Sequence, residues 1–600
     1  MQKTNTMLNN LMFLTRKSFS FDKSLFAAVV VRIPVNILIP LLTSYLTKYI
    51  TSITAGQTEG RTFLIYVLSY SGMIFALTVV NNYAAAKVKY DTMFVRLRYM
   101  GCISEKNMEA DYQNVEDPAG QLLAQKAMNA VYSGNSGTEQ MFEQLVGVFS
   151  SAFGLLTYSA IVLGVIPWGI PVLLAAGAAD FYVGLRFTKW QHRNRGKWTE
   201  YDRRLNYLNN KAGDYRAAKD IRLFHLKSWL EAMYGDFFLS RVFWYRREEN
   251  RRLAINWVGL ILAFCRDGLV YGILIYRLFA RQLEVSSFIF YFSIITQYSI
   301  WVFSLMKNFV ALKSSSYAAE EIRQFLKMPD SFNRGDGMPV PAATCSIQFD
   351  HVGFCYPGAE QDTLCDLNFT IRKGEKVAIV GVNGAGKTTL VKLLCGLYAP
   401  TQGRILVDGN DIRNYNINVY YSLYSAVFQD IYLMPTTIAG NVALTEDERI
   451  DRDRLRRVLA LADLKDKVES LPEKENTLLM KGVQEKGIEL SGGEKQKLAL
   501  ARALYKDGRI VVLDEPTAAL DPIAENEIYQ KYSEMTSGRT AVFISHRLAS
   551  TRFCDTILVL EGGKIVEKGN HEQLMELGGK YAAMFEVQSQ YYKEGAADGQ

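Results

Sequence analysis

The hydrophobic positions of this chain are spread unevenly, and the first half carries long, nearly uninterrupted apolar runs. Links 1–2, 3–4 and 5–6 between these runs are short, whereas links 2–3 and 4–5 are long, charged and helix-like in pattern. The pattern predicts six transmembrane helices that continue beyond the bilayer, since a helix crosses it in ~20 residues. The predicted spans lie at about 24–50, 62–85, 140–165, 168–187, 254–279 and 284–309.

After residue 310 the hydropathy falls and the periodicity changes. A helical pattern runs into a linker with Pro and Gly at 311–344. From 345 to 590, β-branched runs such as KVAIVG and RIVVLDE alternate with helical patterns, and a tail follows at 591–600. This alternation predicts an α/β domain with a largely parallel sheet behind a transmembrane domain at 24–310.

Charge orients this arrangement. The net charge is +7, and Lys and Arg are dense around 186–252, next to apolar segments. The positive-inside rule explains such flanks better than a nucleic-acid surface does, so we expect no nucleic-acid partner. The sequence therefore predicts a multi-pass protein of the inner or plasma membrane with both termini in the cytoplasm. Residues 1–23 are expected to form an amphipathic helix on the membrane surface.

The ionisable residues inside the predicted spans include Arg32, Asp180 and the adjacent pair Arg266 and Asp267. Each costs about 2.5–3.5 kcal/mol at the bilayer centre, so they are expected to face protein or water rather than lipid. Structural pairing between helices and a place on a substrate path are both open for them.

A glycine-rich loop in the second half carries the first chemical signal. The segment VAIVGVNGAGKTTLVKLL combines a strand, a loop and a helix, which is the context of a phosphate-binding P-loop. Lys387 is expected to reach the β- and γ-phosphates and Thr388 to bind Mg²⁺, while the glycines let backbone N–H groups turn toward the phosphate. The predicted ATP-binding residues of this loop are Gly381, Asn383, Gly384, Ala385, Gly386, Lys387, Thr388 and Thr389.

Two adjacent acids end a hydrophobic strand in RIVVLDEPTAALD. Ligands collect where the strands of a parallel sheet end. Asp514 therefore suits a carboxylate that holds Mg²⁺, and Glu515 suits the group that orients or deprotonates an attacking water.

A second anion-binding candidate is the stretch IELSGGEKQKLALARAL. Ser491, Gly492 and Gly493 precede a helical pattern, and a helix N-terminus attracts anions. Ser491 and Glu494 also have the spacing of a capping box. We therefore predict that Glu494 serves the helix cap and leaves the phosphate to its neighbours.

The P-loop, the LSGGE stretch, the LDE acids and a downstream histidine, in this order, resemble the ATP-binding cassette (ABC) transporters. The resemblance is to exporters with six spans fused ahead of one cassette, and it extends over nearly the whole chain. It implies a membrane α-helical bundle with long cytoplasmic extensions plus an α/β P-loop NTPase domain of ABC type. The implied activity is ATP hydrolysis coupled to export.

The resemblance assigns roles to further residues. Tyr356 corresponds to the aromatic that stacks on adenine, and Gln429 to the glutamine that approaches the metal and the water. Asp521 matches the loop that crosses to a partner cassette, and His546 the histidine that contacts the γ-phosphate. In the family, the Ser491–Gly493 segment meets the γ-phosphate held by a second cassette.

The implied working unit is a dimer with two shared ATP sites. A homodimer is favoured because the recognised catalytic positions are intact, and a heterodimer with a related half-transporter stays open. Short helices at 110–120 and 214–224 are expected to sit in cassette grooves near Gln429. The substrate is expected to be a small amphiphile, such as a peptide, lipid or drug. An importer-type or a regulatory, channel-gating ATPase is the alternative.

Overall fold

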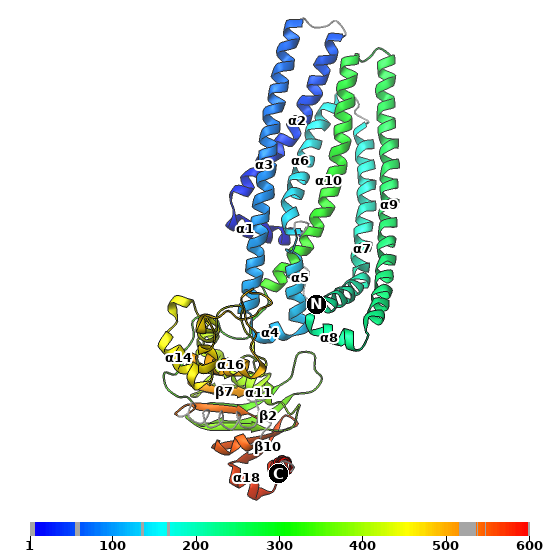
Figure 1. Ribbon diagram of the computed structural model, residues 1–600. Coiled ribbons are helices and arrows are strands. Elements are labelled where there is room, and N and C mark those ends of the chain that lie inside the picture. Colours follow the sequence, from blue (N-terminus) through cyan, green and yellow to red (C-terminus); the bar gives the residue numbers. More distant parts are fainter. Residues whose placement is uncertain are drawn as a thin grey trace. The chain divides into compact units, whose positions relative to one another are not determined.

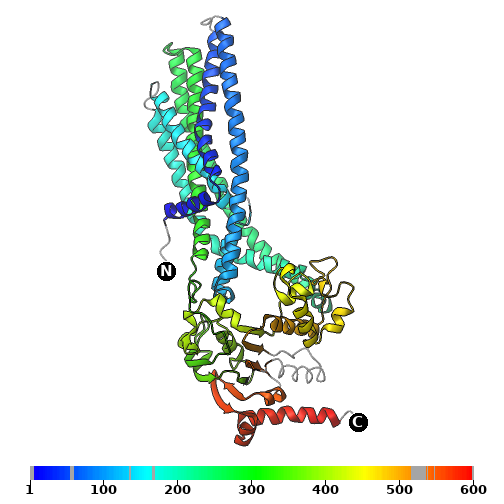
Figure 2. The ribbon, with the colours of Figure 1, turned by 90° about the vertical axis from the view of Figure 1, so that its left-hand side faces the viewer.

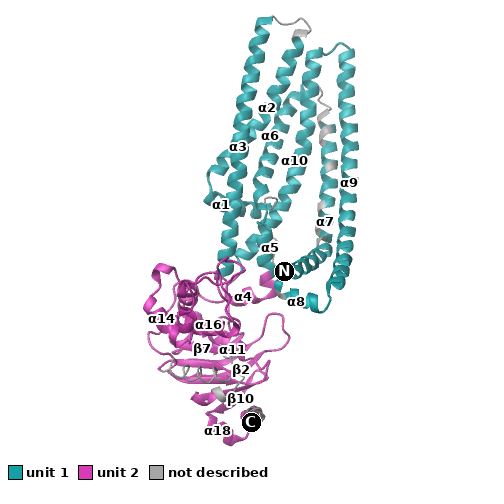
Figure 3. Ribbon diagram, in the orientation of Figure 1, with its two compact units in different colours: residues 1–108, 122–328 teal, residues 109–121, 329–600 magenta. Residues whose placement is uncertain are grey.

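The chain forms two compact units, which Figure 3 shows in different colours: residues 1–108 with 122–328, and residues 109–121 with 329–600. The first is helical and the second is mixed α/β (Figure 1). The structure is a computed structural model, and the residues it describes are 6–54, 60–133, 137–164, 169–514, 536, 538–545 and 548–597.

Helices longer than a bilayer requires dominate the first unit, because ~20 residues suffice to span one. In the described part of the chain, five helices (α2, α3, α6, α9 and α10) are long and apolar enough to cross a membrane. The span predicted at 168–187 begins α7, where several side chains lie outside the described set. The helices are α1 (Met7–Phe21), α2 (Ser24–Thr54), α3 (Gly60–Glu109), α6 (Gly137–Leu163), α7 (Gly169–Gly213), α8 (Tyr215–Leu223), α9 (Lys227–Phe279) and α10 (Val285–Leu326).

Polar pairs join some of these helices. Arg32 of α2 forms an ion pair with Glu143 of α6 (Nη1–Oε1 2.5 Å), so this arginine has a pairing between helices, one of the two roles left open for it. The side chain of Asp180 lies outside the described set. Helix α1 lies across the axis of the long helices (Figure 2) and packs on α10, where the Asn10 amide donates to the Ser316 carbonyl (3.4 Å).

Two short helices, α4 (Tyr112–Glu116) and α5 (Pro118–Asn129), follow α3, and α4 belongs to the second unit. The strands of the second unit are β1 (Ile347–Phe354), β2 (Leu364–Ile371), β3 (Lys376–Val380), β4 (Gln402–Val407), β5 (Asn410–Asp411), β6 (Tyr424–Val427), β7 (Ile510–Asp514), β8 (Thr540–Ile544), β9 (Thr556–Glu561) and β10 (Lys564–Gly569). Its further helices are α11 (Lys387–Leu394), α12 (Ile417–Tyr420), α13 (Ile438–Ala443), α14 (Arg452–Leu461), α15 (Lys465–Glu469), α16 (Gly492–Lys506), α18 (His571–Leu577) and α19 (Lys580–Ala597).

The main sheet has six strands in the order β10-β9-β3-β8-β7-β6, and a second sheet has the order β2-β1-β4-β5. From β9 to β6 every neighbouring pair in the main sheet is parallel, and β10 pairs with β9 antiparallel. The prediction of a largely parallel sheet is confirmed.

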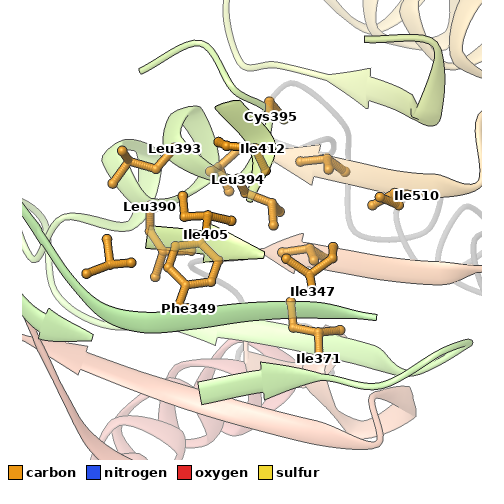
Figure 4. Close-up of a cluster of buried hydrophobic side chains, with 14 of the residues drawn as sticks. Ile347, Phe349, Ile371, Leu390, Leu393, Leu394, Cys395, Ile405, Ile412 and Ile510 are labelled. Atoms are coloured by element: carbon orange, nitrogen blue, oxygen red, sulfur yellow. The ribbon is translucent and has the colours of Figure 1, made fainter. Parts of the chain in front are cut away.

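Alternate residues of the central strands face two separate hydrophobic clusters. In β3, Ile379 enters the cluster that contains α11, and Ala378 enters the cluster that contains α16. Figure 4 shows the first cluster, with Leu390 and Leu394 of α11 packed near Phe349. Because successive side chains of a strand point to opposite faces, α11 and α16 cover opposite faces of the main sheet.

Candidate functional site

The loop between β3 and α11 has the backbone that its glycines predict. Gly381 has a φ of 154°, and a Cβ added there would lie 2.2 Å from the Leu560 carbonyl oxygen. Gly386 has a φ of 100° and precedes α11 directly. The buried Lys387 bends back over the loop, and its Nζ donates to the carbonyls of Gly381 (2.9 Å) and Val382 (3.1 Å). The side-chain ammonium is therefore already held at the loop that is expected to surround the phosphates.

The carboxyl ends of the parallel strands bring further predicted residues to one edge. Ile379 of β3 is paired with Ile544 of β8, which is paired with Asp514 of β7. Asp514 is only 3% exposed. Gln429 follows β6 by two residues and is exposed at the same edge. Strand ends of this kind are where α/β sheets bind ligands.

Three predicted residues, Glu515, Asp521 and His546, lie outside the described residues. Each nevertheless follows a described strand in the sequence. Glu515 comes directly after β7, and His546 comes two residues after the end of β8.

Tyr356, the predicted adenine-stacking residue, stands between the P-loop helix and an aromatic cluster. Its hydroxyl is 3.0 Å from the Thr389 hydroxyl on α11. Its ring lies edge-on to Tyr398 at 5.6 Å and to Phe354 at 5.0 Å. Thr389 is thus buried beneath Tyr356, whereas Thr388 is exposed at the start of the helix.

The oxygen-bearing side chains near the P-loop fit a magnesium ion. Mg²⁺ takes few protein ligands and completes its octahedral shell with water and phosphate oxygens. Thr388, Asp514 and Gln429 supply a hydroxyl, a carboxylate and an amide oxygen from α11, β7 and the loop after β6. Within the described ranges, no group of three His, Cys, Asp or Glu side chains forms a denser metal site.

The LSGGE stretch forms the predicted cap of α16. Ser491 is the N-cap residue; its hydroxyl accepts from the Glu494 N–H (3.3 Å), and a Glu494 carboxylate oxygen accepts from the Ser491 N–H (2.8 Å). Lys467 lies 2.9 Å from the same carboxylate. Burial alone would raise the pKa of Glu494, but the hydrogen bonds to Ser491 and Lys467 lower it. The capping box predicted for Glu494 is confirmed.

The N-terminal end of α4 is fastened to the linker that precedes β1. The Asp111 carboxylate, 3% exposed, accepts hydrogen bonds from the backbone N–H groups of Ser331 and Phe332. It also pairs with Arg334 (Oδ1–Nη2 2.7 Å). Because these donors satisfy a buried carboxylate, the segment 110–120 is held firmly within the second unit.

The C-terminal end of α4 is fastened to α11. Glu116 pairs with Lys392 (2.8 and 3.1 Å) and accepts a hydrogen bond from the Tyr398 hydroxyl. The Lys392 ammonium lies 5.4 Å from the ring centres of both Tyr112 and Tyr398. Burial is the largest single influence and lowers the pKa of Lys392, but the hydrogen bond with Glu116 and the electrostatic effects of Tyr112, Glu116 and Tyr356 together raise it.

The sequence predicted α4 but not its partners. Within the described part of the chain, the polar contacts of α4 are with the linker and with Lys392 and Tyr398, and none is with Gln429. Its expected place in a groove near the Gln429 loop therefore stays a prediction. Lys392 lies 276 residues from Glu116, and no local motif marks it.

A groove beside Gln429 has a volume of about 630 Å³ and lies within the second unit. Its lining is mostly apolar and includes Tyr421, Phe428 and Leu444, with Arg502 and Lys506 also present. Burial lowers the pKa of both cations. The groove is of the size that receives a short helix or a ligand.

The second predicted short segment, 214–224, forms α8 in the first unit. Ala217 and Ile221 of α8 line a cavity of about 560 Å³ together with residues of α7 and α9. Tyr215, Leu223 and Phe224 are exposed instead. Apolar side chains are thus presented at the end of the long helices.

Comparisons with known proteins show which proteins this chain is similar to. A protein-family profile described as ABC transporter matches residues 364–518. The chain is 42% identical over 257 residues to an ATP-dependent lipid A-core flippase of Burkholderia orbicola, which is 43% of this chain and 42% of that protein. It is 27% identical over 451 residues to the subtilin transport ATP-binding protein SpaT of Bacillus subtilis, which is 75% of this chain and 73% of SpaT.

The fold is also found among solved structures. A bacterial Atm1-family ABC exporter with ATP bound superposes with a TM-score of 0.80 and 22% identity, over 94% of this chain and 98% of that one. The chain spans about two fifths of the length of the flippases that it matches. The helical membrane unit and the α/β nucleotide-binding unit together have the exporter fold.

Proposed function

Because this chain belongs to the ABC transporter family and has the fold of an ABC exporter, we propose that it is a half-transporter that couples ATP hydrolysis to export. The cargo is an amphiphilic or hydrophobic solute. The observation that carries the proposal is the alignment of Ile379, Ile544 and Asp514, which brings the P-loop and the acidic strand end to one edge of the sheet.

Each predicted residue has a role at that edge. Tyr356 stacks on adenine, and Lys387 turns from the loop carbonyls to the β- and γ-phosphates. Asp514 and Thr388 hold Mg²⁺, which neutralises charge on the phosphates when it is bound. Glu515 orients or deprotonates the attacking water. Gln429 and His546 complete the contacts to the metal and to the γ-phosphate.

A complete site needs a second cassette. The Ser491–Gly493 segment begins α16, which covers the face of the sheet opposite to the P-loop helix α11 of its own chain. A helix N-terminus offers N–H donors and a favourable dipole to an anion. We infer that this segment meets the γ-phosphate of a partner chain, with Asp521 crossing the same interface. The partner is a second copy or a related half-transporter.

Movement reaches the membrane helices through the short helices. The contacts of α4 with Lys392 tie it to the helix that begins at the P-loop. The groove beside Gln429 suits the exposed apolar residues of a partner's α8. ATP binding would then draw two cassettes together and shift both helices, which is a rigid-body switch of the kind that transporters use.

The protein is a multi-pass membrane protein, and we place both termini and both cassettes in the cytoplasm of a bacterial-type inner or plasma membrane. The dense Lys and Arg around 186–252 support this orientation. Export is favoured over import or channel gating because proteins similar to this chain are named as a flippase and a transport protein.

The two-chain site is tested by mixing two inactive variants in lipid nanodiscs. Lys387→Ala removes the P-loop cation, and Ser491→Ala removes the signature hydroxyl. In a mixed dimer, one shared site joins an intact P-loop to an intact signature, so vanadate-trapped nucleotide and ATPase activity return. Each variant alone stays inactive. If mixed dimers form but trap no nucleotide, the shared site is disproved.

The activity itself is tested by the same preparation. Glu515→Gln is expected to retain ATP binding and to lose hydrolysis by a factor of about 100 or more. Normal hydrolysis in this variant would contradict the assigned water-activating role.

A further inference from the structure

A groove between α7, α9 and α10 in the first unit contains an intramembrane ion pair. Two cavities of about 270 and 690 Å³ lie there and share the lining residues Gly259, Ala263 and Phe303. Figure 1 shows the three helices side by side, and each pair of them is in contact. The smaller cavity contains Arg266 and Asp267. Shared lining residues make the two cavities parts of one groove.

Among the described residues, Arg266 is bound by its neighbour in the sequence alone. Its Nε and Nη2 lie 2.8 and 3.2 Å from the two Asp267 oxygens, and the Ser299 hydroxyl donates to Asp267 (3.0 Å). The Arg266 side chain is 11% exposed and that of Asp267 is 28% exposed. Successive helical residues do not normally face each other, so this pair replaces an absent interhelical partner among the described residues. A guanidinium has five N–H donors, and most of them are still available in the cavity.

The rest of the groove adds positive charge. Arg252 and Lys307 line the larger cavity, and none of its described lining residues is acidic. Arg252 pairs with Glu248 and Glu249 of its own helix, whereas Lys307 forms no ion pair within the described part of the chain. Both side chains are exposed within the chain, so their charges can face a ligand in the groove.

Between the charges the groove is apolar. Arg252 and Arg266 are separated by about 21 Å along α9 at 1.5 Å per residue. Phe181, Leu260 and Phe303 line the stretch between them. The groove thus has the length and the lining for an extended hydrocarbon body.

We propose that this groove binds an anionic amphiphile, with its phosphate or carboxylate on Arg266 and its apolar body along Phe303. Asp267 acts as the internal anion that occupies Arg266 until the ligand displaces it. A neutral or cationic amphiphile gains no such contact. This inference rests on the proposed export function and names the class of its cargo.

The test compares three single-chain amphiphiles with the same dodecyl tail in nanodiscs of phosphatidylcholine. Binding of dodecyl phosphate, dodecylphosphocholine and dodecyltrimethylammonium to the full-length protein is measured by tryptophan fluorescence without nucleotide. Dodecyl phosphate is expected to bind about tenfold more tightly than the other two.

Two substitutions separate a binding role from a structural one. Arg266→Gln is expected to weaken dodecyl phosphate binding by about tenfold, whereas Asp267→Asn keeps or tightens it, because the competing anion is gone. If the pair only stabilised the fold, both variants would lose binding together. If Arg266→Gln fails to fold, Lys307→Gln, which removes a positive charge from the groove, is compared with Arg266→Lys, which retains one.

The matched control is Arg32→Gln, which removes a different intramembrane arginine that pairs with Glu143 away from the groove. It is expected to bind all three amphiphiles as the unmodified protein does. The proposal is overturned if Arg266→Gln binds dodecyl phosphate as tightly as the unmodified protein does, or if the trimethylammonium probe binds equally well. Because binding is read without ATP, failure of export with intact binding would count against the proposed function instead.

Discussion

The two short helices predicted at the tips of the long cytoplasmic links differ in how they are held. Helix α4 is held within the second unit by contacts of Asp111 at one end and of Glu116 at the other. Helix α8 belongs to the helical unit and leaves Tyr215, Leu223 and Phe224 exposed. One helix is therefore part of its own cassette, whereas the other leaves an apolar end exposed, which we propose binds a partner. The difference predicts that substitutions in α4 change stability as well as coupling, while those in α8 change coupling alone.

The largest effect is expected at the buried end of α4. Asp111→Ala removes the acceptor for two linker N–H groups and the partner of Arg334, which costs about 2–3 kcal/mol. Amide hydrogen exchange at Ser331 and Phe332 should accelerate by about thirtyfold or more. Asp336→Ala, an exposed aspartate of the same linker, is the control. Unchanged exchange in Asp111→Ala would show that α4 is held by other contacts.

The next effect concerns the link from α4 to the P-loop helix. Glu116→Lys places a second cation beside Lys392, and translocation of a fluorescent phosphatidic acid per ATP hydrolysed should fall by about tenfold. The double variant Glu116→Lys with Lys392→Glu restores the opposite charges and should recover most of the loss. Translocation that stays coupled in the single variant would break the assignment of α4 as a transmitting element.

A smaller effect is expected at α8. Phe224→Asp puts a charge on a side chain that is 70% exposed within one chain. Thermal stability of the detergent-purified protein should not change, but translocation per ATP should fall by about fivefold, because the charge would have to enter an apolar groove. Leu239→Asp, equally exposed on α9, is the matched control. A loss of stability in Phe224→Asp would remove the contrast between the two helices.

The smallest effect is expected at Glu494, which belongs to neither helix. Glu494→Gln keeps the capping geometry, so the ATPase rate should change by less than about twofold. A change of more than about tenfold would mean that the carboxylate acts on the phosphate.

The pH dependence of the same residue gives a second readout. The pKa of Glu494 lies below its ordinary value of 4.5, so the ionised form is favoured in the folded state. Its stabilisation of α16 is complete above that pH and is lost as the pH falls through the lowered pKa. The Gln variant should lack this loss, as acid-induced exchange at the start of α16 will show.

Much of the cassette could be predicted because its signals are local. A glycine loop between a strand and a helix, and two acids at a strand end, are fixed by neighbours in the sequence, and β3, α11 and β7 appear where these motifs require them. The capping box at Ser491 is equally local. The partners of α4 were out of reach, since Glu116 and Lys392 meet only after the chain has folded.

The membrane unit illustrates the same limit. Apolar length predicted its helices, but the choice of partner for each charge depends on how the helices pack. Arg32 pairs with an acid on another helix, whereas Arg266 pairs with the acid next to it in the sequence. Hydropathy cannot distinguish these two outcomes, although they lead to different functions.

The hydrogen bonds and the ion pair of Asp111 join two places in the chain that are far apart in the sequence. Helix α3 leads into Asp111, and α10 leads into the linker that Asp111 binds. The two chain segments that connect the units at this point are therefore joined by the contacts of Asp111. A force on this joint would therefore act on α3 and α10 together rather than on either helix alone.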